Sequence, residues 1–473
     1  MKDILISKYL LIIFLLISCL LLLFIQLRSS PQSSATKAGS RHLIVISVDA
    51  LHASDLEAIK KLPNFKMLMD NGAYAQEVVG VYPSLTYPSH TSVLTGTNPD
   101  KHGIYNNELF QPGVKEPEWY WYAKDIQQLT LCDLAKQEKM KVGAIFWPVL
   151  AGAKIDYNCP EIWPVKGQNQ ILLSLTSGTP LFTLNMYRKF SKMLDGQNQP
   201  NLDNFSTAAA SWLIREKRPN LVLLHLTDTD SQRHRYGFKS DEVTESMARQ
   251  DLRIGQLIEA AREAGIYDNT TFVVLGDHGF LDVDYKINLN IALRQAGLIT
   301  VDSEGKVIDW KAYANGADGS AQIVIKDKED LDSKQAVATI LQQLKEDPLS
   351  GLEQIYNREG AAQKGVAGYF DYMVEAKEGY YFVNNWWGQE VTEIIEQKID
   401  GQDKKAGYAA THGYDPLKTG YRTLFLACGA GVKPGVILPT INLIDEGPTL
   451  ANFLGLSLSG ADGRLLNEIL ADN

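Results

Sequence analysis

Cysteine is scarce in this chain, with 4 residues among 473. Cys19 lies in an apolar stretch near the N-terminus, which leaves Cys132, Cys159 and Cys428 in the rest of the chain. Complete pairing within one chain is excluded, because the number of remaining cysteines is odd. A single disulfide between Cys132 and Cys159 stays open at this stage.

Basic residues are also fewer than acidic residues. The chain has 46 Lys and Arg residues against 56 Asp and Glu residues, and its net charge is -10 at pH 7. Surfaces that bind nucleic acid in general are basic, so no nucleic-acid-binding surface is expected. Small phosphate esters remain compatible with this balance, because bound metal ions can reverse the sign of the local charge.

Only one apolar run is long enough to cross a membrane. Residues 9–27 carry no charge, and at about 1.5 Å per residue a helix of this length spans a bilayer core of roughly 30 Å. We expect a transmembrane anchor, preceded by a short tail of residues 1–8. A cleaved signal sequence is the main alternative, although its apolar region is usually shorter. A lipoprotein cleavage box ending at Cys19 ranks third, because further apolar residues follow it.

The absence of a second such run places the rest of the chain on one side of the membrane. An N-terminal segment of the export type puts that part outside the cytoplasm, in the periplasm or the extracellular space. Residues 28–41 are rich in Ser and contain Pro31 and Gly39, which is typical of a flexible tether. Residues 42–473 form the main domain, and a hydrophobic content of 45% is enough for a substantial core.

Five short apolar runs predict a sheet at the centre of this domain. They lack polar alternation, which is typical of parallel strands buried on both faces. Helical segments separate them, most clearly residues 241–264, which begin with acidic residues and stop at Gly265. The alternation predicts an α/β fold, with a mostly parallel central sheet and helices on both faces. The runs are residues 43–48, 142–147, 221–226, 271–275 and 423–428.

Residues 281–410 interrupt the α/β pattern. They contain a polar loop at 314–320, an expected strand at 321–325 and an expected helix at 333–345. We interpret this stretch as a lobe inserted into the domain.

Acidic residues and histidines follow three of the five runs. Asp49 ends the first, Asp230 comes shortly after the third, and Asp277 and His278 come after the fourth. The carboxyl ends of parallel strands meet at one edge of a sheet, so these side chains are expected to cluster there. His234 joins them, because it lies one helical turn beyond Asp230.

Thr86 and His412 complete a set of oxygen and nitrogen ligands. The set exceeds the four ligands of one tetrahedral zinc ion and fits two ions with positions left open for substrate and water. Imidazole and carboxylate groups favour Zn²⁺, with manganese and iron as alternatives. Two ions about 4 Å apart can hold both the attacking and the leaving oxygen of a phosphoryl transfer. We therefore expect two Zn²⁺ per chain.

Thr86 lies in the run Tyr82-Pro-Ser-Leu-Thr-Tyr-Pro-Ser-His90, at the start of a helix expected to run through Val93. Threonine at such a point is commonly a helix N-cap. A hydroxyl is a poor nucleophile unless its proton is removed, and a bound metal ion can promote this. The acids and histidines elsewhere in the chain therefore favour a metal-activated threonine over a simple cap.

Other residues compete for ligand roles. Asp228 is nearer to its strand than Asp230, but only Asp230 is four residues from His234. The remaining histidines are expected to be structural, with local hydrogen bonds; they are His42, His52, His90, His102 and His225.

The order of these residues resembles that of the nucleotide pyrophosphatase/phosphodiesterase family, in the alkaline phosphatase superfamily. The run 82–90 is similar to the family's nucleophile motif, and Thr95-Gly-Thr-Asn-Pro-Asp-Lys-His-Gly-Ile-Tyr-Asn-Asn107 is similar to the segment that follows it. Further similarities are Phe146-Trp-Pro148, Ile155-Asp-Tyr-Asn158 and Gly447-Pro-Thr-Leu-Ala-Asn-Phe-Leu-Gly455. The resemblance implies an alkaline-phosphatase-like three-layer fold.

By this resemblance the residues take specific roles. One zinc ion is held by Asp230, His234 and His412, and the other by Asp49, Asp277 and His278 together with Thr86. Thr86 is the nucleophile, which forms a phosphothreonine intermediate. Asn107 matches a residue that holds a phosphate oxygen, and Tyr87 matches an aromatic position that contacts the nucleobase or the leaving group. The family pattern Glu-Pro-Asp-x-x-Gly-His is Asp228-Thr-Asp-Ser-Gln-Arg-His234 here, so Arg233 replaces a glycine.

The resemblance implies a hydrolase of phosphodiester or pyrophosphate bonds, acting on a nucleotide-like small molecule. A phosphomonoesterase or phosphonate hydrolase is the alternative, because Arg233 and Arg235 could bind the extra charge of a monoester. A sulfatase needs an oxidisable Cys or Ser where Thr86 stands. A binding protein with a degraded site is disfavoured by the complete ligand set. The aromatic run 119–122 is a candidate for one wall of a substrate groove or for part of the core.

Overall fold

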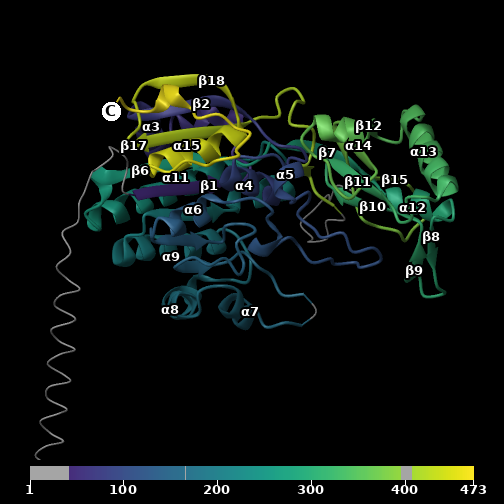
Figure 1. Ribbon diagram of the computed structural model, residues 1–473, viewed down its shortest axis with the longest axis horizontal. Helices are drawn as coiled ribbons and strands as arrows, with labels where there is room; N and C mark the ends of the chain where they lie inside the picture. The colour runs from purple at the N-terminus through teal and green to yellow at the C-terminus, as the bar shows by residue number, and fades with distance from the viewer. Residues whose placement is uncertain (1–41, 166, 396–406, 473) are drawn as a thin grey trace, which may run out of the picture. The chain divides into compact units, whose positions relative to one another are not determined.

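An eight-stranded sheet forms the centre of the structure, a computed structural model (Figure 1). The strand order is β18-β2-β17-β6-β1-β5-β3-β4. Among these strands, only β17 runs antiparallel to its neighbours. The strands are β1 (His42–Val48), β2 (Gly72–Val79), β3 (Val142–Ile145), β4 (Tyr157–Cys159), β5 (Leu221–Leu226), β6 (Thr270–Leu275), β17 (Thr423–Gly429) and β18 (Val436–Asn442).

The structure describes residues 42–165, 167–395 and 407–472, all within one compact unit. The predicted tail at 1–8, the membrane segment at 9–27 and the tether at 28–41 all lie outside these residues. Within the described ranges, no helix combines the length and the apolar character needed to cross a membrane.

Each of the five apolar runs contains a strand, and the mostly parallel sheet is confirmed. The expectation that residues 423–428 are parallel is wrong. The chain reaches β17 from His412, which lies at the carboxyl edge of the parallel strands, so β17 must run back across the sheet in the opposite direction. Strands β2, β4 and β18 were not expected; β2 and β18 contain exposed residues that break the apolar pattern, and β4 is only three residues long.

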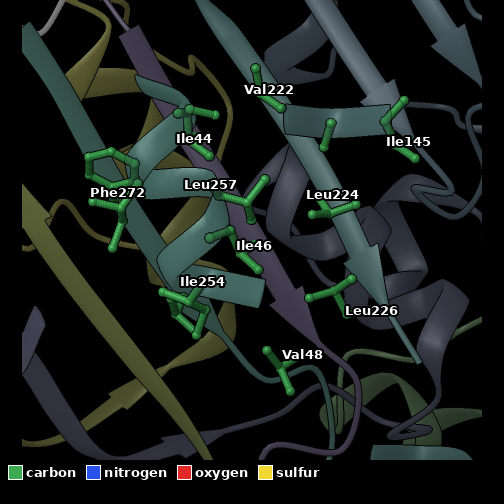
Figure 2. Close-up of a cluster of buried hydrophobic side chains, with 14 of the residues drawn as sticks. Ile44, Ile46, Val48, Ile145, Val222, Leu224, Leu226, Ile254, Leu257 and Phe272 are labelled. Atoms are coloured by element: carbon green, nitrogen blue, oxygen red, sulfur yellow. The ribbon is translucent and has the colours of Figure 1, made fainter. Parts of the chain in front are cut away.

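One face of the sheet is covered by helices α3, α8, α9 and α11. In Figure 2, Ile254 and Leu257 of α11 lie against Ile44 and Ile46 of β1. Burying a side chain of this size contributes about 1.5–3 kcal/mol. The helices are α3 (Pro63–Asp70), α8 (Pro180–Phe190), α9 (Asn201–Lys217) and α11 (Asp241–Glu263).

The opposite face is covered by α4, α6 and α15. Leu43 and Val45 of β1 point to this side, because side chains alternate along a strand. The result is the three-layer arrangement of helices, sheet and helices. The helices of this face are α4 (Thr86–Thr95), α6 (Leu131–Gln137) and α15 (Glu446–Phe453); shorter or peripheral helices are α2 (Leu56–Ile59), α5 (Pro99–His102), α7 (Gln170–Ser177) and α10 (Asp228–Tyr236).

Residues 281–395, together with 410–411, form smaller sheets, seen mainly in green in Figure 1. One has the order β10-β11-β13-β12, another is built on β7, and β8 pairs with β9. The strands are β7 (Leu281–Ile287), β8 (Ile299–Val301), β9 (Val307–Trp310), β10 (Ala312–Ala317), β11 (Ser320–Ile325), β12 (Leu352–Asn357), β13 (Tyr372–Ala376), β14 (Gly379–Phe382), β15 (Thr392–Ile394) and β16 (Ala410–Thr411). The helices are α12 (Leu289–Gln295), α13 (Leu331–Glu346) and α14 (Arg358–Gln363).

The expected strand at 321–325 and helix at 333–345 are present as β11 and α13. The expected polar loop at 314–320 is mostly strand β10, because its backbone pairs with β11. We call residues 281–410 the lobe, and its status as an insertion stays a prediction.

The three cysteines of the described ranges are free and buried. Cys132 packs among the side chains on the α4 face of the sheet, whereas Cys159 packs on the α11 face. The disulfide left open above is therefore absent, since the central sheet separates the two thiols.

A buried ion network holds the turn between β5 and α10. Asp203 accepts hydrogen bonds from the backbone N–H groups of Thr227 and Asp228, both at 3.0 Å. Arg253 of α11 binds Asp203 at 3.3 Å and Asp228 at 2.9 Å. Burial would raise the pKa of Asp228, but its bonds with Arg249 and Arg253 hold that pKa below its usual value. The network thus fixes the start of α10 relative to the core.

Replacing Arg253 with Met is expected to lower the free energy of unfolding by about 3–5 kcal/mol, because two buried carboxylates lose the cation that they share. Chemical denaturation followed by circular dichroism measures the loss. Arg262→Met is the matched control on the same helix, where the arginine is half exposed, and a change under about 1 kcal/mol is expected. Equal losses in the two variants would contradict the role of the network.

Candidate active site

Three adjacent parallel strands deliver acidic side chains to one edge of the central sheet. β1 lies between β6 and β5. Asp49 follows β1, Asp277 follows β6, and α10 begins just after β5. In α10, Asp230 and His234 are one turn apart, and both face the same site. The clustering expected at this edge is therefore present.

The predicted metal ligands come together in two groups. In each group, one potential ligand atom from every member lies within 4.8 Å of the others. The rings of His278 and His412, one from each group, are stacked with centroids 3.8 Å apart. The groups are Asp230, His234 and His412, and Asp49, Asp277 and His278.

Backbone carbonyl groups orient the three histidines. His234 Nδ1 lies 2.9 Å from the carbonyl oxygen of Ala410, His278 Nδ1 lies 3.2 Å from that of Gly279, and His412 Nδ1 lies 3.4 Å from that of Ser84. With Nδ1–H donating to these carbonyl oxygens, each Nε2 is left as an acceptor that faces the acids. Histidines that bind metal commonly use their second nitrogen in this way.

The carboxylates have oxygens suited to a cation. Asp49 Oδ1, Asp230 Oδ1 and Asp277 Oδ2 are buried without a hydrogen-bond partner among the described residues. Burial and the nearby charge of Asp49 raise the pKa of Asp277 to about 7 and that of Asp230 well above its usual value. Acids crowded in this way need positive charge nearby. The donors and their burial therefore fit divalent metal ions.

Thr86 is the first residue of α4. Its Oγ1 is 3.3 Å from His278 Nε2, and 8% of the residue is exposed. The N-cap of α4 is Leu85, so Thr86 does not cap the helix. Its hydroxyl faces the site at a helix N-terminus, where the dipole favours negative charge.

Asn107 contacts the backbone of the residue next to Thr86. Its Oδ1 accepts a hydrogen bond of 2.9 Å from the N–H of Tyr87, which leaves the Nδ2 group as a donor. Asn107 also lines the cavity described below. This position fits the expected role of binding a phosphate oxygen.

Tyr87 does not have the position expected of it. Its side chain is completely buried, its hydroxyl donates to Glu161 at 3.0 Å, and its ring packs edge-on against Trp119. A ring with no exposed surface cannot stack on a substrate. Trp119, from the aromatic run 119–122, lines the cavity instead, whereas Trp121 belongs to the core.

A cavity of about 700 Å³ opens over the two ligand groups. The lobe supplies one part of its wall and the main domain supplies the other. The main-domain residues include Trp119, Phe146 and Trp163, and those of the lobe include Asp318, Phe382, Asn384 and Tyr408. Lys115 is the one lysine or arginine among the lining residues.

Arg233 and Arg235 are not among the residues that line this cavity. Arg233 is fully buried; it binds Asp55 at 2.6 Å and lies over the ring of Phe238. Arg235 lies over the ring of Tyr236. The argument for a phosphomonoesterase depended on these two arginines, and their positions remove it.

Asp228 is bound by Arg249 and Arg253 in the core, so Asp230 is the member of the pair that reaches the site. His90 also lies within ligand distance of His225 and Asp277. Its ring nitrogens, however, contact the Thr86 carbonyl oxygen at 2.7 Å and Ser47 Oγ at 2.9 Å. The structural role expected for His90 therefore fits its contacts.

His225 does more than the structural role expected for it. Its Nε2 lies 3.0 Å from Asp49 Oδ2, and its Nδ1 lies 2.7 Å from Glu161 Oε2. Glu161 also accepts from the Tyr87 hydroxyl, so a buried chain of contacts connects Asp49 to the residue beside Thr86. The sequence offers little indication of this contact chain, because His225 lies inside a strand and Glu161 follows a proline in an irregular segment.

Comparisons with known proteins agree with this geometry. Residues 43–415 match the family described as type I phosphodiesterase / nucleotide pyrophosphatase. The chain is 25% identical over 250 residues to human ectonucleotide pyrophosphatase/phosphodiesterase family member 1, which covers 50% of this chain and 23% of that protein. It is 23% identical over 410 residues to a venom phosphodiesterase of Macrovipera lebetinus, which covers 83% of this chain and 40% of that protein. The chain thus matches less than half the length of these relatives.

Solved structures show the same fold. The structure of murine ectonucleotide pyrophosphatase / phosphodiesterase 5 aligns with a TM-score of 0.62 at 19% identity, and the alignment covers 91% of this chain and 100% of that one. The human counterpart aligns with a TM-score of 0.63 at 18% identity. At such low sequence identities, the structural similarity shows a shared fold.

Replacing His225 with Gln is expected to weaken metal binding about 10- to 100-fold, because Asp49 loses the contact that orients it. Competition with a chromogenic chelator measures the affinity. Glu161→Gln should give a smaller loss in the same direction. His102→Gln is the control: His102 is also buried, but its partners are Ser92 and the backbone of Ile104. An unchanged affinity in His225→Gln would contradict this role.

Proposed function

The chain belongs to the type I phosphodiesterase / nucleotide pyrophosphatase family, and from this we propose that it hydrolyses phosphodiester or pyrophosphate bonds of nucleotide-like molecules. The observation that carries the proposal is the position of Thr86. Its hydroxyl lies at the cavity beside two groups of carboxylates and imidazoles, each compact enough to hold one metal ion. This arrangement suits nucleophilic attack on a phosphate ester.

We propose that each group holds one zinc ion. Asp230, His234 and His412 would hold one, and Asp49, Asp277 and His278 would hold the other, next to Thr86. When bound, the ions would lower the pKa of the threonine hydroxyl and offset the charge of the phosphate oxygens. The mixture of imidazole and carboxylate ligands supports zinc.

In the reaction, Thr86 Oγ1 attacks phosphorus in line with the leaving group. A bond forms between the threonine oxygen and phosphorus, while the bond to the leaving alkoxide or phosphate breaks. The Nδ2 group of Asn107 would donate to an equatorial oxygen as negative charge develops there. Water then cleaves the phosphothreonine, which releases a phosphate monoester and restores the hydroxyl of Thr86.

The walls of the cavity favour a diester over a monoester. A monoester carries additional negative charge, and an arginine that pairs with it is the usual solution. Arg233 and Arg235 lie away from the cavity, and the Nζ of Lys115, which does line it, lies over the ring of Trp387. Much of the remaining lining is aromatic or amide in character. Trp119, Trp163 and Phe146 can pack against the second ester group or a base.

We also propose that residues 9–27 hold the domain at a membrane, with the site outside the cytoplasm. The support is the sequence of that segment, which has the length and apolar character of a bilayer span.

Replacing Thr86 with Ala is expected to lower the turnover of an aryl phosphodiester at least about 1,000-fold, because the nucleophile is removed. Metal content, measured by elemental analysis, should stay near two zinc ions per chain, since the carboxylates and imidazoles remain. Thr91→Ala is the control on the same helix, where the hydroxyl binds only the Tyr87 carbonyl. Retained turnover in Thr86→Ala would remove Thr86 from its proposed role.

Turnover should be measured on an aryl phosphodiester, an aryl phosphomonoester and a nucleoside triphosphate, and the monoester is expected to be hydrolysed most slowly. Arg235→Gln is expected to leave the ratio of diester to monoester turnover within about two-fold, because this side chain lies outside the cavity. Asn107→Ala should lower diester turnover about 100-fold, since a donor to the phosphate oxygen is lost. A preference for the monoester, abolished in Arg235→Gln, would instead support a phosphomonoesterase.

A further inference from the structure

Helices α7 and α8 expose large apolar side chains. Ile171 and Leu172 of α7 are 49% and 61% exposed, and Leu181 and Leu184 of α8 are 75% and 49% exposed. The two helices contact each other, α8 also contacts α9, and α7 and α8 both lie at the lower edge of the coloured ribbon in Figure 1. We call the surface formed by these four residues, with Arg188 and Lys189, the α7–α8 face.

Helix α7 buries two serines and exposes two large apolar residues, although Leu173 packs inward. Its buried residues are Ser174 and Ser177, whereas Ile171 and Leu172 point outward. Ser174 Oγ is satisfied inside by Gln170 at 3.0 Å and by the Tyr187 hydroxyl at 3.3 Å. Surface helices normally bury their apolar stripe and expose their polar residues. The outer side of α7 is therefore suited to an apolar environment.

The segment that contains α7 and α8 has a positive net charge, whereas the rest of the protein is negative. Residues 162–194 contain no Asp or Glu, yet they contain Lys166, Arg188, Lys189 and Lys192, in a chain of net charge -10. Arg188 and Lys189 lie in the last turn of α8 and are exposed. Exposed leucines beside lysine and arginine are typical of helices that lie in the interface of a membrane with anionic lipids.

We propose that the α7–α8 face docks on the surface of a membrane that contains anionic lipids. Leu172 and Leu181 would enter the headgroup region and Arg188 would contact lipid phosphates, while Lys189, whose Nζ lies over the ring of Trp212, adds positive charge. A second copy of the chain is a poorer occupant, because a two-fold interface would bring the basic residues of both copies together.

The proposed membrane attachment adds to this inference but is not required for it. A tether of residues 28–41 reaches at most about 50 Å when fully extended, so an anchored domain stays near the lipid surface. Chain segments that flank the two helices also line the cavity: Trp163 precedes α7, and Gln197 follows α8. Docking would thus hold one wall of the cavity close to the lipid headgroups.

The test uses the purified full chain with vesicles of phosphatidylcholine, with or without phosphatidylglycerol. A polarity-sensitive fluorophore is attached at Leu181→Cys in a Cys19→Ser background, since the other cysteines are buried. In the vesicle-bound fraction, recovered by flotation, its emission should shift to shorter wavelength, and quenching by iodide should fall at least about three-fold. The effect should be larger with phosphatidylglycerol and should be lost in Arg188→Glu/Lys189→Glu.

Leu331→Cys is the matched control, because Leu331 is 72% exposed at the start of α13 and lies between Asp330 and Asp332. Its probe should remain open to iodide. A chain that floats with equal iodide access at both positions would overturn docking and leave the anchor intact. A chain that does not float would overturn both ideas. Protection of Leu181→Cys that appears without vesicles and grows with protein concentration would assign the face to a second copy instead.

Discussion

The site depends on the adjacency of three parallel strands. β6, β1 and β5 are neighbours in register, with Ser47 paired to Leu275 and Val48 paired to Leu226. The residue that follows β1 is therefore held between the loop after β6 and the helix after β5. Because these strands are buried on both faces, a shift of one strand would disturb the packing on both sides of the sheet. Core packing thus fixes the spacing of the acids to within the tolerance that a metal site needs.

That geometry places several carboxylates close together in a buried region. Their ionised forms are unfavourable there unless positive charge or hydrogen-bond donors lie nearby. The protein provides part of the compensation itself. Burial would raise the pKa of Asp49, but its hydrogen bond with His225 and the adjacent His278 imidazole hold that pKa well below its usual value. The charge of Asp49 then contributes to the raised pKa values of Asp277 and Asp230. The remaining excess of negative charge is what divalent cations would neutralise.

Much of this architecture could be predicted from the sequence because it rests on local patterns. The sequence alone contains the apolar runs, the helical spacing of Asp230 and His234, and the acids at the strand ends. The predictions that failed depend on contacts between residues far apart in the sequence. The burial of Tyr87 follows from Glu161 and Trp119, and the position of His225 between two acids requires β5 to lie beside β1. The direction of β17 depends on the path of the lobe.

The substitution of Arg233 for a glycine shows the same dependence on distant contacts. On a helix that carries two potential ligands, an arginine suggests a charged pocket, yet its guanidinium points into the core toward Asp55 and Phe238. The side chain therefore stabilises the back of α10 without changing the charge of the cavity. Differences in substrate preference are better sought in the lobe, because residues 316–318, 381–385 and 407–408 form much of the cavity wall. Those residues can vary without moving the strand ends, since the two parts of the cavity are built from separate sheets. The strand ends that carry the acids and the substrate wall are thus formed by different parts of the chain, although Ala410 of the lobe orients His234. Only the strand ends can be predicted from sequence patterns.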